Sequence, residues 1–266
     1  MNAPKPTASP GLTLAIATLA AIIGTLVVNT LSNFLAPDGQ NVGEIANTIL
    51  SGVLITPANY AFAIWGLIYL GLIAYGTYQL KPNQRQTPTI QRVNQLLIIA
   101  CVAQMLWIFL FTLQYFSLSI LAMLGILLPL MGAYLALGIG QQRANRQRRW
   151  LAHYPFSIYL AWISVATVVN VASALYAAGW SGWGLSGTAW TSVMIVVSAA
   201  IAALVIFTRS DIPFTLIFLW AYGAIAARHG DVPSIWITAA GAALVLLVLL
   251  GIRRWQQTPP SKQAEL

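Results

Sequence analysis

The stretch PFSIYLAWISVATVVNVASALYA, residues 155–177, contains no Asp, Glu, Lys or Arg. About 20 consecutive apolar residues are long enough to cross the hydrocarbon core of a bilayer as an α-helix. The stretch is therefore predicted to be a membrane-spanning helix. Tyr159, Trp162, Ala166 and Asn170 follow one another at steps of three and four, so they share one side of that helix.

The composition of the whole chain agrees with a membrane protein. Of its 266 residues, 59% are hydrophobic and 7% are charged, whereas soluble domains carry about 25% charged residues. Uninterrupted apolar stretches of spanning length occur at residues 12–34, 57–80, 93–114, 117–140, 155–177, 188–207, 212–227 and 232–252. The sequence therefore predicts an all-α polytopic membrane protein with eight transmembrane helices, of which the seventh is the shortest.

The distribution of basic residues predicts the topology. If the chain starts inside, every one of its 13 Lys and Arg residues except Arg228 falls in an inside segment, as the positive-inside rule requires. This predicts a multi-pass protein with both termini cytoplasmic, and it fits a bacterial cytoplasmic membrane. The basic residues form no continuous face with interleaved aromatics, so nucleic acid is not expected as a partner.

The segments outside the spans have distinct compositions. Residues 1–11 and 256–266 are polar and contain Pro and Ser, which predicts flexible tails. Apolar residues recur at steps of three and four in NVGEIANTILSGVLI, residues 41–55, which predicts an amphipathic helix at the interface or over the mouth of the bundle. Trp180, Trp183 and Trp190 are expected in an interfacial aromatic belt.

The chain offers no recognisable catalytic or metal-binding set. No charged residue lies within the body of a predicted span, which argues against an ion-driven transporter. Cys101 is the only cysteine, and His153 and His229 share no motif at metal-ligand spacing. No catalytic residue, metal site or required cofactor is predicted.

Three predicted spans carry aromatic stripes, and Gln104 and Asn170 add side-chain amides to two of them. Two interpretations stay open. The amides bond neighbouring helices while the aromatics fill the core, or these residues line an apolar pocket with a few polar groups that orient a flat ligand. Gly132, Ala136 and Gly140 form a small-residue stripe that fits close packing within the chain or a homodimer.

Two motifs resemble the signatures of the TspO/MBR family, the tryptophan-rich sensory proteins related to the mitochondrial translocator protein. They are WGLIY at residues 65–69, and YLAW at residues 159–162 with Asn170 at the family spacing. Because known members are five-helix bundles, the resemblance implies such a bundle over residues 12–178, followed by a three-helix extension over 179–255. The sequence departs from the family in two places. Residues 35–56 contain no Trp, whereas the first loop of the family usually does. No Lys or Arg follows soon after Tyr176, so the sterol-recognition pattern of animal members is missing.

Family members bind porphyrins, haem-like tetrapyrroles, sterols and aromatic drugs in a pocket under the first long loop. Carried over to this sequence, the resemblance implies a site made by the following ligand-binding candidates: Trp65, Tyr69, Gln104, Trp107, Tyr159, Trp162 and Asn170. The leading hypothesis is binding of a planar hydrophobic ligand, such as porphyrin or haem, for sensing, sequestration or transfer. The alternatives are transport of a small hydrophobic metabolite and tetrapyrrole oxidation at Trp162.

Overall fold

The computed structural model describes residues 11–35 and 39–257, and this part of the chain is helical without any strand. The long helices are α1 (Leu12–Ser32), α3 (Ile64–Gln79), α5 (Pro88–Thr112), α6 (Phe116–Ala136), α8 (Tyr154–Ala177), α9 (Gly187–Arg209), α10 (Ile212–Arg228) and α11 (Pro233–Gln257). Shorter elements are α2 (Val42–Asn47), α4 (Pro82–Arg85), α7 (Arg146–Arg148), a π turn (Arg149–His153) and two 3-10 turns (Asn59–Ala63 and Gly182–Gly184).

The predicted polytopic helical fold is confirmed. Within residues 11–35 and 39–257, seven helices are long and apolar enough to cross a membrane, and α10 is a shorter apolar helix. The short seventh segment is also well covered, because α10 packs against α8, α9 and α11. Its side chains Phe214, Phe218 and Tyr222 are accordingly buried.

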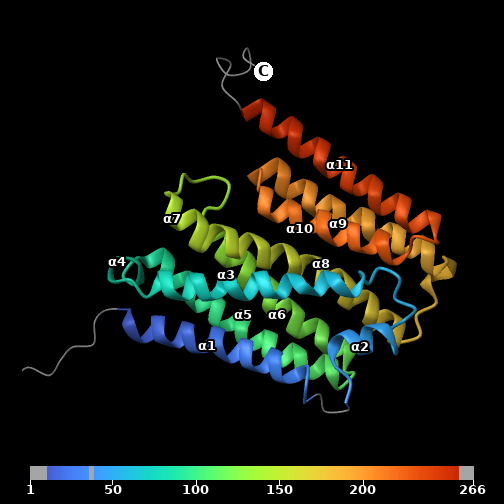
Figure 1. Ribbon diagram of the computed structural model, residues 1–266, viewed down its shortest axis with the longest axis horizontal. Coiled ribbons are helices and arrows are strands. Elements are labelled where there is room, and N and C mark those ends of the chain that lie inside the picture. The colour runs from blue at the N-terminus through green and yellow to red at the C-terminus, as the bar shows by residue number, and fades with distance from the viewer. Residues whose placement is uncertain (1–10, 36–38, 258–266) are drawn as a thin grey trace, which may run out of the picture.

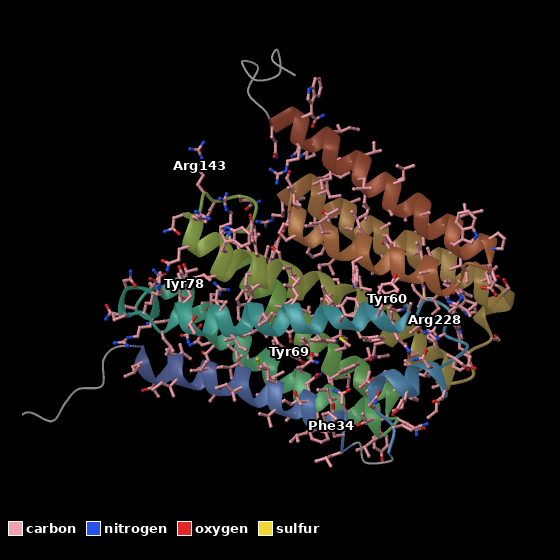
Figure 2. The ribbon with its side chains drawn as sticks, viewed as in Figure 1. Phe34, Tyr60, Tyr69, Tyr78, Arg143 and Arg228 are labelled. Atoms are coloured by element: carbon pink, nitrogen blue, oxygen red, sulfur yellow. The ribbon has the colours of Figure 1, made fainter. Side chains whose placement is uncertain are left out.

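The helices form a bundle to which the C-terminal helices are added on one side (Figure 1). α5 packs against α1 and α6, α8 packs against α3 and α6, and α10 joins this group through α8. The two ends of the bundle differ. In Figure 2, Tyr78 and Arg143 lie at one end, and Phe34 and Arg228 at the other. The division of the chain into a five-helix unit and a three-helix extension stays a prediction.

A chain of buried hydrogen bonds ties α1, α3 and α5 together. The Tyr75 hydroxyl donates to Asn94 Oδ1 at 2.6 Å, and Asn94 Nδ2 donates to Gln79 Oε1 at 2.9 Å. Gln79 Nε2 in turn donates to the carbonyl oxygen of Ala15 at 2.9 Å. Polar side chains in a bilayer need such partners, because no water is available in the hydrocarbon core. These hydrogen bonds therefore fix the positions of the three helices, and each of the three polar side chains has a partner.

Asp211 connects α10 to the rest of the bundle. Its carboxylate accepts hydrogen bonds from the Tyr134 hydroxyl of α6 at 2.8 Å and from the Ser157 hydroxyl of α8 at 2.6 Å, and it caps α10 through the Phe214 amide. Burial raises the pKa of this carboxyl above its ordinary value, although the bonds from Ser157 and Tyr134 oppose that shift. The buried carboxyl group thus joins three helices at one point.

The small residues of α6 and its C-terminal turn make contacts within the chain. A Cβ added at Gly132 would lie 3.2 Å from the Leu96 side chain of α5. Gly140 has a φ of +77°, and a Cβ there would overlap the carbonyl oxygen of Arg209. Gly132 and Gly140 thus permit close approach inside one chain. Homodimer formation stays a prediction.

The loop after α1 contains less helix than its amphipathic pattern indicates. Asn41 and Glu44 form a reciprocal capping box at the start of α2, but the helix ends at Asn47. The chain continues in turns through which Leu50, Val53 and Ile55 are buried in the core. Of the two tails predicted to be flexible, residues 1–10 and 258–266 lie outside the described residues, and α11 extends to Gln257.

Candidate functional site: a cavity beneath the first long loop

A cavity of about 750 Å³ lies beneath α2 and the segment of residues 56–59 that leads into α3. This volume falls within the range of about 300–1,000 Å³ that is typical of small-molecule sites. Its walls come from the C-terminal end of α1, the loop of residues 41–59, and facing parts of α3, α5, α6 and α8. The aromatic side chains of its lining are Phe62, Trp65, Tyr69, Trp107, Phe111 and Trp162.

The structure brings most of the predicted site residues together at this cavity. The lining includes Trp65, Tyr69, Gln104, Trp107, Trp162 and Asn170. Tyr159 is buried but is not among the described residues that line the cavity. Its ring lies behind the wall, where it packs edge-on against Trp65 with 6.1 Å between ring centroids.

Ring contacts hold the aromatic wall in place. Trp65 and Tyr69 are one helical turn apart on α3 and stack with centroids 5.5 Å apart and planes inclined by 25°. Phe62, in the 3-10 turn before α3, meets Trp162 of α8 edge-to-face with 6.1 Å between ring centroids. Aromatic pairs prefer these offset and edge-on arrangements because of their ring quadrupoles. The wall is therefore a packed set of rings with defined orientations.

Asn170 uses its side-chain amide to join three helices. Its Oδ1 accepts a hydrogen bond from the Trp107 indole N–H of α5 at 2.7 Å, and its Nδ2 donates to the Ser119 hydroxyl of α6 at 3.0 Å. Between the two interpretations of the buried amides, Asn170 fits the first, because it bonds neighbouring helices. It also occupies the only hydrogen-bond donor of the Trp107 side chain.

Gln104 differs from Asn170. Its side chain is fully buried and lines the cavity, yet neither Oε1 nor Nε2 has a hydrogen-bond partner among the described residues. The hydroxyl groups of Tyr69 and Tyr159 are buried and unpaired in the same way within the described chain. Most buried polar side-chain atoms in proteins are hydrogen-bonded. Of these three residues only Gln104 and Tyr69 are in the described lining, so their unpaired groups are the candidate hydrogen-bond partners of a molecule inside the cavity.

The loop that covers the cavity is attached to α10. The Trp220 indole N–H donates to the carbonyl oxygen of Ala61 at 3.1 Å, and the Arg228 guanidinium donates to that of Pro57 at 3.3 Å. The backbone N–H of Ala58 donates to the carbonyl of Ala224 at 3.1 Å. His229, next to Arg228, also contacts the loop, through a hydrogen bond with the backbone of Leu54. Burial lowers the pKa of the His229 imidazole, and this hydrogen bond opposes the shift.

Several lining residues were not among the predicted ligand-binding candidates. Phe62 and Phe111 fall on the aromatic stripes of their helices, so helical periodicity was a signal for them. Met123 of α6 and the polar end of α1 at Asn29 and Ser32 gave no such signal, because no motif marks them. Their place in the lining follows from tertiary packing alone.

These features define the class of the protein, a polytopic α-helical membrane protein with an aromatic-walled cavity at one end of its bundle. The chain belongs to the family of TSPO-like proteins, whose family model matches residues 15–252. The match runs from α1 into α11, so it includes the C-terminal helices. No curated protein and no solved structure matches the chain in the corresponding comparisons.

Proposed function

We propose that this protein binds a planar hydrophobic ligand of the tetrapyrrole type in the cavity beneath the first long loop. The observation that carries the proposal is the aromatic wall contributed by α3, α5 and α8 around a volume of about 750 Å³. Flat aromatic ligands bury large apolar areas and gain further from stacked or edge-on contacts with such rings. The role of binding is sensing, sequestration or transfer of the ligand.

The proposed contacts are made by rings, and they need no iron. Trp65, Tyr69 and Trp162 offer ring faces and edges to a macrocycle, and Trp107 adds a further ring from α5. Neither His153 nor His229 belongs to the described lining of the cavity. A metal-free porphyrin therefore fits the proposal as well as haem does, and neither is a required cofactor.

The proposed setting is a bacterial cytoplasmic membrane with both termini cytoplasmic. This orientation rests on the basic residues, which in the inside segments include Lys81, Arg85 and the cluster of residues 143–149. The loop over the cavity would then face the outer side, and membrane lipids would surround the bundle. A homodimer is a further proposal, and it needs a surface other than Gly132 and Gly140, since these two residues pack against Leu96 and Arg209 of the same chain.

The proposal is tested by titrating the purified full-length protein with protoporphyrin IX and recording tryptophan fluorescence. Trp162→Ala should lower the porphyrin affinity obtained from the saturable quenching about tenfold, because the loss of an aromatic contact of about 1.4 kcal/mol corresponds to a tenfold change in Kd. Trp236→Ala is the matched control, since Trp236 is on α11, is 40% exposed and is not part of the described lining.

Equal affinity of the wild type and Trp162→Ala would refute the proposed site. A separate flux measurement in sealed proteoliposomes distinguishes binding from transport. Porphyrin accumulation above passive leak, lost in Trp162→Ala, would replace sequestration by transport as the function of the cavity.

A further inference from the structure

The inner end of the cavity is formed by Tyr69, Gln104 and Trp162. These are the lining residues of α3, α5 and α8 that lie farthest along each helix from the covering loop. Tyr69 Oη and both polar atoms of the Gln104 amide are buried there without a hydrogen-bond partner among the described residues. The aromatic cavity therefore ends at buried polar groups that lack a partner, and we call Tyr69 Oη and the Gln104 amide the inner polar end.

We infer that the inner polar end binds an uncharged group of the ligand that has both a hydrogen-bond donor and an acceptor, such as a lactam or an amide. This inference rests on the proposed function, because it assumes that the cavity holds a ligand. The Gln104 amide presents one carbonyl acceptor and two N–H donors, and the Tyr69 hydroxyl is both donor and acceptor. A cyclic amide matches this set with paired bonds.

The depth of these groups makes their pairing important. Gln104 is fully buried, and it lies in the middle part of α5, where the bilayer provides no water. An unpaired amide in such surroundings loses its hydration without compensation. A hydrogen bond from a ligand, or from water ordered inside the cavity, would offset this cost, and the experiment below separates these two occupants.

The charges around the cavity argue for an uncharged group. Glu44 is the only charged side chain in the described lining, and it belongs to the capping box of α2 at the covering loop. A carboxylate of the ligand at the inner polar end would have no Lys or Arg to pair with among these lining residues. An unpaired charge at this depth is strongly unfavourable.

Unpaired polar groups are not a general property of cavities in this chain. A second cavity of about 540 Å³ lies on the other face of α8, against α9. There the Thr167 and Thr191 hydroxyls donate to helix carbonyl oxygens at 2.7 and 2.8 Å, and the Trp190 indole N–H donates to the Gly182 carbonyl at 2.6 Å. The second cavity thus lacks the feature that distinguishes the first.

The test measures binding of biliverdin and biliverdin dimethyl ester, two linear tetrapyrroles with lactam ends that differ in the charge of their side chains. The full-length wild type is compared with Gln104→Met, which keeps the length of the side chain and removes its amide. Gln141→Met, in an exposed loop position outside the described lining, is the matched control. Thermal unfolding of each variant confirms that it is folded.

We expect the ester to bind the wild type at least as tightly as the acid, and Gln104→Met to bind the ester about tenfold more weakly. Unchanged affinity in Gln104→Met would overturn the inference and assign the amide to water. A tenfold preference of the wild type for the acid would also overturn it, while the proposed function would stand. If the wild type bound neither compound nor protoporphyrin IX, the proposed function itself would fail.

Discussion

The hydrogen bond between Trp107 and Asn170 should be measurable as a coupling between the two residues. Asn170→Leu keeps most of the side-chain volume and leaves the Trp107 N–H without its acceptor at 2.7 Å. Ser119 keeps a partner, since its hydroxyl also donates to the Phe116 carbonyl oxygen at 2.7 Å. The loss therefore falls mainly on Trp107, whose side chain is 8% exposed.

The magnitude follows from the number of bonds that are lost. Hydrogen bonds between membrane helices contribute on average about 0.6 kcal/mol, so the two bonds of Asn170 to Trp107 and Ser119 amount to about 1.2 kcal/mol. Leaving a buried N–H unpaired costs about 1–3 kcal/mol. We expect Asn170→Leu to lower the free energy of unfolding by about 1–3 kcal/mol.

A double-mutant cycle isolates the bond itself. The free energy of unfolding is measured in mixed micelles for the wild type, Asn170→Leu, Trp107→Phe and the double variant. The double variant should be more stable than the sum of the single changes predicts, by about 0.6–1.5 kcal/mol. Trp220→Phe is the control partner, because the Trp220 N–H bonds to Ala61 instead and should combine additively with Asn170→Leu. Additive effects of Asn170→Leu and Trp107→Phe would refute the assigned role of Asn170.

Two further predictions concern the contacts of Asp211 and Gly140. Burial raises the pKa of Asp211 above its ordinary value of 3.8, so the folded state favours the protonated carboxyl group. The contribution of this group to the free energy of unfolding is therefore complete below pH 3.8, and it is lost as the pH rises through the pKa of the folded state. Asp211→Asn should therefore gain stability relative to the wild type over that pH range, as measured by unfolding at a series of pH values, and a pH-independent difference would contradict this. Gly140→Ala should lower the free energy of unfolding by more than about 1 kcal/mol, since its Cβ would overlap the Arg209 carbonyl. Gly241→Ala on α11, where a Cβ meets nothing within 4 Å, should be neutral or stabilising in the same unfolding assay.

The helices were predictable because apolar length is set by bilayer thickness. Their ends were less so, since polar residues also join helices where the chain leaves the apolar layer. α5 starts at Pro88 and includes Arg92, ahead of the predicted start at residue 93. For residues 41–55 the predicted helix was too long. The helix ends at Asn47, and the apolar side chains beyond it reach the core from turns.

The aromatic stripes found by helical periodicity include most of the residues that line the cavity. Periodicity did not show which residues of one stripe reach the cavity. Tyr159 and Trp162 are three residues apart, so their directions differ by about 60°, and only Trp162 reaches the cavity. The pairing of Asn170 with Trp107 joins residues 63 positions apart, which one sequence does not indicate. Gln104 and Asn170 are both amides in apolar helices, and only the packing decides which one is paired.

If the cavity binds the proposed ligand, the attachment of the covering loop to α10 should make the rates of ligand entry and release depend on the C-terminal helices. A chain ending near residue 180 would retain every ring of the cavity wall but lose Trp220, Ala224 and Arg228, which hold the loop at residues 57–61. Such a chain would keep its contact surface for a ligand and lose part of the anchorage of its entrance. The residence time of a ligand would then depend on all the helices, whereas its equilibrium affinity would depend mainly on the aromatic rings of the cavity wall.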